Sequence, residues 1–459
     1  MKILIAASEM AGVCGEGGLA EQVAAAAYGL AAGGHAVTVV LPFHRQVREN
    51  KALGLKRTRT RFAVQMGDLE WTCDVREASA RGIRHLFVAR DESFDRSGLY
   101  GVDGRDYDDN AARFLFFSKC VAELVRLRGP DVAGVFGWQA APVAVFIRAS
   151  RFAVPVVFAP VSLEFQGNFW SHDFALTNLP GSFFADEGME FYGSMNFLKS
   201  GIVFADAVVL PGGRFASLAM TPRLGCGLEG VLRHHRSKIH GISPGVGGSS
   251  LPLVARDAEA VSSARRRLFG QVAGPEPRVF LLDAQATGGM DLVFQTIDRI
   301  ATPALKVVVL GGVPESSREA LEFAIRLHAG RFVHREVVEA STAADCLAAG
   351  DFLLLPDSMD ADSAFLCLAM KNGIVPVARD CEGLEEWVRD FDPVSGHGCG
   401  LVFRRAGVEG VADAVKRAFL LPDAEKQMLS DRCRALEFTP EASARRLERV
   451  FLDLKNRCQ

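Results

Sequence analysis

A glycine-rich segment near the start of the chain has the residue types of a phosphate-binding loop. Gly15, Gly17 and Gly18 follow the apolar run 3–7 and precede an alanine-rich segment whose apolar residues recur at helical spacing. Glycines at a strand-to-helix turn present backbone amides to an anion at close range. Phosphate loops of this kind usually add a cation, whereas this loop carries Glu16. Its backbone therefore suits phosphate and its charge does not, and a plain tight turn explains the glycines equally well.

The elements around this loop follow one pattern, in which short apolar runs alternate with longer segments of helical periodicity. The runs that we predict to be strands cover 3–7, 36–41, 85–88, 132–136, 154–159, 207–210, 279–282, 307–310, 332–334, 352–355 and 375–378. Continuous apolar strands between helices are typical of parallel sheets covered on both faces. We therefore predict an α/β fold of two doubly wound, Rossmann-like domains that face a cleft. The domains are expected at 1–246 and 247–436, and a closing helix over 437–459 is expected to return to the first domain.

The composition argues against several classes of function. The chain has 459 residues, 49% of them hydrophobic, and a formal net charge of -3 without a long basic run, so we expect no nucleic-acid and no membrane partner. Its ten cysteines form no CxxC pair, and the first apolar run is too short for a signal-peptide core, so we expect a reduced, cytoplasmic protein. His234, His235 and His240 have no carboxylate or cysteine at ligand spacing, so we predict no metal and no cofactor.

Short motifs occur in a fixed order along nearly the whole chain. They are Ser8-Glu9-Met10, Gly17-Gly18-Leu19-Ala20, Gly98-Leu99-Tyr100-Gly101, the run 108–114, Phe165-Gln166-Gly167, Glu190-Phe191-Tyr192-Gly193, Asn196-Phe197-Leu198-Lys199, Ala205-Asp206, the run 225–230, and Gly289-Met290-Asp291-Leu292. In order and spacing these motifs resemble the bacterial glycogen synthase and plant starch synthase family, glycosyltransferase family 5. The resemblance implies the glycosyltransferase B fold, with a glucan-binding first domain and a nucleotide-sugar-binding second domain. It also implies retaining transfer of glucose from ADP-glucose to an α-1,4-glucan.

The resemblance further implies a set of catalytic and phosphate-binding positions, and here they hold other residues. The lysine of the family's glycine loop aligns with Gly15, and a histidine that approaches the sugar aligns with Val161. An arginine and a lysine that neutralise the leaving phosphate align with Asp283 and Gly288, and a glutamate aligns with Asp360. Loss of one contact that stabilises developing charge typically lowers the rate by about 10²–10³. We therefore expect the ordinary transfer reaction to be severely impaired.

Other aligned positions keep residues that could still contact a substrate. The substrate-binding candidates are Gly17, Gly18, Asn110, Arg113, Trp138, Gly289, Asp360 and Ser363. Some of them also have a structural explanation: Trp138 could pack at a strand end, and Arg113 could form an ion pair with Asp109 one helical turn earlier. Lys371 or Arg379 could supply a compensating cation from an unaligned position.

Three functions are compatible with this pattern. The substitutions favour a catalytically degenerate glycogen or starch synthase homologue that acts as a glucan-binding or regulatory pseudoenzyme, with an α-glucan or a functional synthase as its partner. The first alternative is an active glycogen synthase that uses ADP-glucose as its donor substrate. The second is a transferase with a changed sugar donor. The sequence thus leaves open whether the protein is an enzyme, because activity depends on the site rather than on the fold.

Overall fold

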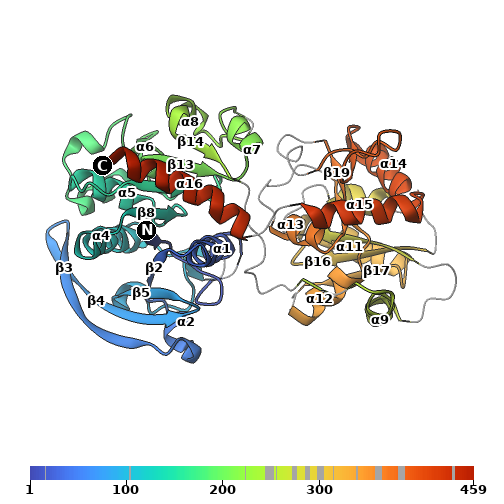
Figure 1. The fold of residues 1–459 in the computed structure, drawn as a ribbon, viewed down its shortest axis with the longest axis horizontal. Helices are drawn as coiled ribbons and strands as arrows, with labels where there is room; N and C mark the ends of the chain where they lie inside the picture. The colour runs from blue at the N-terminus through green and yellow to red at the C-terminus, as the bar shows by residue number, and fades with distance from the viewer. Residues whose placement is uncertain are drawn as a thin grey trace. The chain divides into compact units, whose positions relative to one another are not determined.

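The computed structural model describes residues 1–15, 17–102, 105–222, 224–242, 253–254, 256–270, 277–284, 290–296, 304–313, 315–336, 340–356, 364–380, 388–436 and 440–458. The chain forms two compact units (Figure 1). The first unit contains Met1–Ser249 and Thr439–Gln459, and the second contains Ser250–Phe438. Within the described part of the chain, no helix is long and apolar enough to cross a membrane. The domain limits predicted at 246 and 436 stay a prediction, because they lie in or beside segments outside the described residues.

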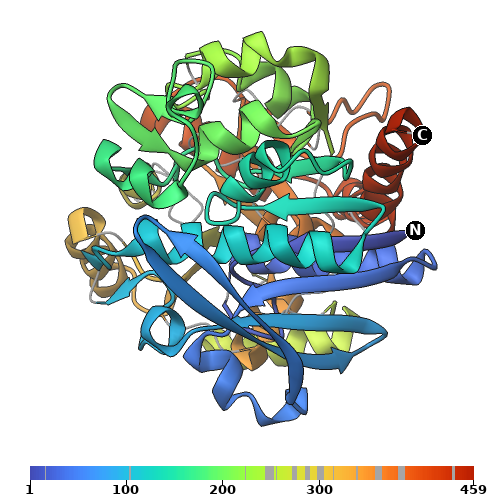
Figure 2. The ribbon, with the colours of Figure 1, turned by 90° about the vertical axis from the view of Figure 1, so that its left-hand side faces the viewer.

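A nine-stranded sheet forms the centre of the first unit. Its strands, in spatial order, are β14 (Ile239–Gly241), β13 (Ala207–Leu210), β9 (Val156–Ala159), β8 (Val132–Phe136), β1 (Lys2–Ala6), β2 (Ala36–Pro42), β5 (Ile83–Ala89), β4 (Leu69–Ala80) and β3 (Lys56–Met66). The strands from β14 to β5 are parallel, whereas β4 and β3 are antiparallel. Figure 2 shows β3 and β4 as a long twisted hairpin. Apart from the edge strand β14, the parallel strands are mostly buried, as their apolar sequences require.

Helices cover this sheet and connect its strands. The longer helices of the first unit are α1 (Gly18–Ala32), α4 (Asn110–Arg128), α5 (Pro142–Ala149), α6 (Phe197–Phe204) and α16 (Pro440–Cys458), and the shorter ones are α2 (Arg45–Glu49), α3 (Asp91–Phe94), α7 (Gly213–Leu218) and α8 (Glu229–His234). Helix α16 packs along α1 and places Phe451 in the core, where a side chain at Gly134 would lie 3.3 Å from the Phe451 ring. The predicted return of the C-terminal helix to the first domain is therefore confirmed.

A small antiparallel sheet stands apart from the large one in the first unit. Its strands lie in the order β10 (Asn168–Phe169), β12 (Ser194–Asn196) and β11 (Glu190–Phe191). A further hairpin pairs β6 (Gly101–Val102) with β7 (Arg105–Asp106). These short pairs order the long connections that precede α6 and α4.

The second unit contains a six-stranded parallel sheet. Its strands lie in the order β17 (Phe332–Arg335), β16 (Leu305–Leu310), β15 (Arg278–Asp283), β18 (Phe352–Leu355), β19 (Val375–Arg379) and β20 (Leu401–Phe403). Its helices are α9 (Ala258–Phe269), α10 (Met290–Thr296), α11 (Glu315–Leu327), α12 (Ala340–Ala349), α13 (Ala364–Lys371), α14 (Gly407–Phe419) and α15 (Asp423–Ala435). Both units are thus doubly wound α/β structures, which confirms the predicted fold class.

Candidate functional site

The loops that follow β1, β8 and β9 meet at one edge of the large sheet, because the carboxyl ends of parallel strands share an edge. Ser8 and Glu9 follow β1, Trp138 follows β8, and Val161 follows β9. Helix α1 begins beside them, at Gly18. This edge is where a doubly wound sheet binds its ligands, so it is the candidate site of the first unit.

A buried carboxylate occupies the glycine-rich loop. The side chain of Glu9 is almost fully buried, and its Oε1 accepts a hydrogen bond from the Tyr100 hydroxyl. The same hydroxyl lies 2.7 Å from Ser8 Oγ. Burial, with the Glu9 charge as a second cause, raises the pKa of the Tyr100 phenol and raises the pKa of the Cys14 thiol to about 12. Both groups are therefore neutral near pH 7, and neither offers a positive charge to a phosphate.

The Glu9 side chain also fills the space beside Gly15. Gly15 has φ +79°, and its backbone N–H donates to Gln46 Oε1 at 3.0 Å. A Cβ atom at Gly15 would lie 2.1 Å from Glu9 Oε2 and 2.7 Å from Glu9 Cδ. Since real side chains do not approach this closely, position 15 can carry a larger residue only if Glu9 moves. The missing lysine and the position of Glu9 are thus structurally linked.

The other glycines of the loop keep open space around them. Gly17 has φ +101° and immediately precedes α1, and neither Gly17 nor Gly18 would bring a Cβ within 4 Å of other atoms. The first turn of α1 contains Glu21 as its acidic residue. These two glycines therefore leave open space at the start of α1, and phosphate binding by them stays a prediction.

Val161 has an unusual backbone conformation. Its φ is +68°, in the left-handed region, which a β-branched residue adopts only under strain of about 1–3 kcal/mol. A cavity of about 40 Å³ adjoins it, lined mostly by apolar side chains such as Phe136, Val209 and Ile242. The position aligned with the family's histidine is thus apolar, and it has no group that could stabilise charge.

Trp138 belongs to an aromatic cluster. Its ring centroid lies 5.4 Å from that of Phe114, 5.8 Å from Phe169 and 6.3 Å from Phe197. A Cβ at Gly167 would lie 2.3 Å from Trp138 Cε3, so the neighbouring loop presses directly on this ring. These contacts agree with the packing role, and sugar stacking by Trp138 stays a prediction.

Arg113 and Asn110 support the loop that carries Tyr100. Arg113 is fully buried, and its guanidinium donates to Ser93 O at 2.6 Å, to Asn110 Oδ1 at 2.5 Å and to Leu99 O at 3.0 Å. Asn110 Nδ2 donates to Tyr100 O at 2.9 Å. Desolvation lowers the pKa of Arg113 to about 10, which leaves it charged at pH 7. Both side chains therefore hold backbone groups of the loop, and their contact with a substrate stays a prediction.

In the structure, Asp109 forms its ion pair with Arg96 rather than with Arg113. Asp109 accepts hydrogen bonds from Arg96, at 2.7 and 2.5 Å. The Arg113 side chain points into the interior instead, where backbone carbonyls satisfy it. The prediction of this partner was wrong, because helical spacing brings two residues to one face without fixing the direction of a long side chain.

The described candidates of the second unit lie near its sheet. Asp283 ends β15 and Arg379 ends β19, both at the carboxyl edge, and both side chains are half-buried. Lys371 donates to Arg434 O at 3.0 Å, so its ammonium group caps the end of α15. The other predicted site positions of this unit, Gly288, Gly289, Asp360 and Ser363, lie outside the described residues.

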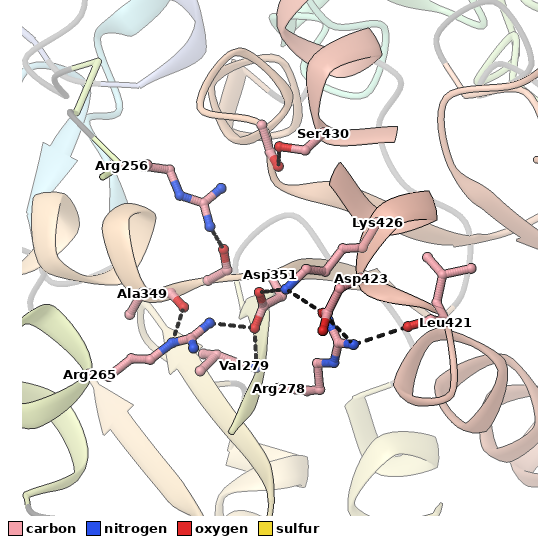
Figure 3. Close-up of polar contacts among 12 residues, drawn as sticks. Arg256, Arg265, Arg278, Val279, Ala349, Asp351, Leu421, Asp423, Lys426 and Ser430 are labelled. Atoms are coloured by element: carbon pink, nitrogen blue, oxygen red, sulfur yellow. Dashed lines mark hydrogen bonds and ion pairs between the residues drawn. The ribbon is translucent and has the colours of Figure 1, made fainter. Parts of the chain in front are cut away.

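A cluster of charged side chains lies at the opposite, amino edge of the sheet of the second unit. Asp351 is buried just before β18, and it accepts from Arg265 at 2.7 Å, Lys426 at 2.9 Å and the Val279 backbone N–H at 2.9 Å (Figure 3). Arg256 donates to carbonyl groups that follow α12 and α13. These cations neutralise a buried carboxylate and cap helix ends, which are structural tasks.

The sequence motifs did not mark Glu9 and Tyr100 as site residues. Both belong to motifs that carry the family resemblance, but only the structure shows that Tyr100 donates to Glu9 and that Glu9 fills the space beside Gly15. As for metals, the described part of the chain contains no group of three or more His, Cys, Asp or Glu side chains that could hold an ion.

Comparisons with known proteins agree with this architecture. A family model for the starch synthase catalytic domain matches residues 2–234. The glycogen synthase of Opitutus terrae is 31% identical over 483 residues, covering 99% of this chain and 100% of that protein. The glycogen synthase of Koribacter versatilis is 31% identical and covers 98% of each chain. Among solved structures, the catalytic domain of starch synthase IV from Arabidopsis thaliana, bound to ADP and acarbose, matches with a TM-score of 0.87 at 22% identity over 99% of both chains.

Proposed function

Because the chain belongs to the glycogen synthase and starch synthase family, we propose that it is an α-glucan-binding member in which glucose transfer from ADP-glucose is lost or severely reduced. Its role would be to hold glucan, or to regulate a functional synthase that acts on the same glucan. The main support for lost transfer is Gly15, which stands where the family resemblance implies a lysine and so leaves the Glu9 carboxylate beside it without that positive charge.

The charge at this loop opposes a diphosphate. A lysine there would attract phosphate, whereas a carboxylate within about 4 Å of a phosphate oxygen would repel it by about 4 kcal/mol at an effective dielectric constant near 20. An energy of this size corresponds to a loss of about 10³-fold in affinity. Asp283, at the position aligned with an arginine, adds a second negative charge at the carboxyl edge of the second sheet.

The apolar surroundings of Val161 support the same proposal. A retaining transfer develops charge on both the sugar and the leaving phosphate, and polar groups aimed at that charge supply much of the rate enhancement. The valine side chain has no polar atom, and its neighbours at the cavity are mostly apolar.

Calorimetric titration tests the nucleotide part of this proposal. We expect no heat of binding with ADP or ADP-glucose up to millimolar concentration, while maltoheptaose gives a measurable binding isotherm with the same preparation. The maltoheptaose titration shows that the protein sample is folded and competent. A dissociation constant for ADP-glucose below about 0.1 mM would refute the nucleotide part of the proposal, because binding of that strength would require a cation at the site.

A transfer assay tests the catalytic part. Incorporation of labelled glucose from ADP-glucose into glycogen should be at least about 10³-fold slower than for an ordinary member of the family. Ordinary turnover with ADP-glucose would identify an active glycogen synthase. Turnover with another labelled sugar nucleotide, and not with ADP-glucose, would identify a transferase with a changed donor. Either result overturns the proposal.

A further inference from the structure

Large exposed aromatic side chains flank the small sheet of β10, β12 and β11. Trp170 directly follows β10 and is 68% exposed, and Tyr192 directly follows β11 and is 87% exposed. Aromatic rings of this size are usually buried or at interfaces, because their apolar area is costly to leave in water. Two such rings on one small sheet indicate a surface that binds a ligand.

The strand register brings these rings to the same end of the sheet. Phe169 pairs with Met195 and Phe191 pairs with Ser194 across the central strand β12. Trp170, one residue beyond Phe169, therefore stands at the level of Ser194, and the outer two strands are separated by about 10 Å. The ring of Tyr192 contacts that of Phe191, with centroids 4.6 Å apart. Trp170 and Tyr192 therefore lie next to the two outer strands at the same end of the small sheet, and the Phe191 ring packs against the buried Lys199.

Ring contacts and hydrogen bonds hold the residues beneath Trp170 and Tyr192 in place. Phe169 points to the buried side, where its ring lies 4.8 Å from that of Phe197. Asn196 Nδ2 donates both to Gln166 Oε1 at 2.8 Å and to Asn168 Oδ1 at 2.7 Å. The buried Lys199 donates to backbone carbonyls on the β11 side, including Asp186 O at 2.6 Å. The rings therefore stand on a preorganised support, which reduces the entropy lost on binding.

Polar groups beside the rings suit a neutral ligand rich in hydroxyl groups. Asn168 uses its Oδ1 to accept from Asn196, and its exposed amide nitrogen can donate outward. The ring of His172 contacts that of Trp170 in a tilted arrangement, with centroids 4.1 Å apart. Sugar rings present both apolar C–H faces and hydroxyl groups, so they match aromatic faces that are bordered by such donors and acceptors.

We propose that the exposed rings of Trp170 and Tyr192 form a stacking platform for glucose units of an α-glucan, and that this platform works without a nucleotide. The separation of about 10 Å between the outer strands lets Trp170 and Tyr192 contact different sugar units of one chain. The inference rests on the proposed glucan binding and locates it on the small sheet.

Affinity electrophoresis through gels that contain glycogen tests the platform, with calorimetry on maltoheptaose as the second measurement. The variants are Trp170→Ala and Tyr192→Asn, the second chosen because Asn tolerates the φ of +50° at this turn position. Each should weaken binding by about 2- to 10-fold, and the double variant by more than either. Phe323→Ala is the matched control, because it removes a 59% exposed ring from α11 in the second unit, and it should bind as the unaltered protein does.

The outcomes separate this inference from the proposed function. If the unaltered protein binds glycogen and the double variant binds equally well, the platform is refuted and the proposed function stands. If the unaltered protein binds no glycogen, both are refuted. Trp170→Phe keeps an aromatic face and should recover most of the affinity; failure to do so, with an unchanged melting temperature, would also count against stacking.

Discussion

Replacing Gly15 by alanine should destabilise the protein through two separable effects. The φ of +79° places any L-residue in the left-handed region, at a cost of about 1–2 kcal/mol. The added Cβ would also lie 2.1 Å from Glu9 Oε2, so the carboxylate must leave its position. Its hydrogen bond from Tyr100, a bond to a charged group, contributes about 1.5–3 kcal/mol. The two effects together give about 3–5 kcal/mol.

Gly34→Ala provides a matched control. Gly34 has φ +84°, nearly the same as Gly15, but a Cβ there would meet nothing within 4 Å. It should therefore cost only the conformational part, about 1–2 kcal/mol. Calorimetric thermal unfolding measures the stability of both variants. In a folding unit of this size, a loss of about 1 kcal/mol in the free energy of unfolding lowers the melting temperature by roughly 2–4 °C.

A third variant tests the link to Glu9 directly. In a Glu9→Ala background the carboxylate is gone, so Gly15→Ala should cost no more than Gly34→Ala does in the unaltered protein. Equal melting temperatures for Gly15→Ala and Gly34→Ala would refute the reasoning, as would a Gly15→Ala cost that Glu9→Ala does not reduce. The same coupling predicts that Gly15→Lys alone creates no ADP binding.

Further predictions concern buried charge and protonation. Lowering the pH from 7 to 5 should destabilise the first unit. In the folded protein, desolvation lowers the pKa of His44 to about 3 and that of His85 to about 4. In the unfolded chain each histidine has a pKa of about 6.5, so at pH 5 the unfolded chain binds protons that the folded protein does not. Each histidine should cost about 2 kcal/mol at pH 5, and a urea midpoint that is the same at both pH values would contradict this. Asp351→Ala should lower the free energy of unfolding by about 3–5 kcal/mol, because it removes the carboxylate that neutralises the neighbouring cations. Urea denaturation measures this loss, with Asp423→Ala as the control: Asp423 is 86% exposed, and a loss as large as that of Asp351→Ala would contradict the reasoning. Arg113→Lys should lower the melting temperature markedly, because one ammonium group cannot reach three acceptors; an unchanged value would show that the loop does not depend on them.

The sequence predicted most of the strands that are apolar throughout, although the three-residue strand β20 was not among them. The runs at 132–136 and 207–210 coincide with β8 and β13, because strands buried on both faces need continuous apolar residues. Strands β3 and β4 were not predicted. Residues 56–61 of β3 read Lys-Arg-Thr-Arg-Thr-Arg, and such an exposed edge strand has no apolar run to reveal it.

The candidate site was less predictable than the fold, because its geometry depends on contacts between distant residues. Alignment identified Gly15 as a changed position, but the occupation of its space by Glu9 follows from side-chain conformation. In the same way, Trp170 and Tyr192 carry no periodic signal that would separate an exposed ring from a buried one. Their exposure depends on the register of a sheet whose strands are two or three residues long.

The pairing of α16 with α1 has a consequence for how the chain folds during synthesis. Residues that pack on α16, including Val23, Ala27 and Leu30 of α1, emerge from the ribosome before the second unit does, whereas α16 is made after the second unit. At about 5–20 residues per second, roughly 400 intervening residues take about 20–80 s. Throughout that interval the apolar face of α1 lacks its partner, although the second unit, made of contiguous chain, can already fold. The first unit to be synthesised is therefore the last to be completed, and nascent chains should need protection from aggregation at this helix.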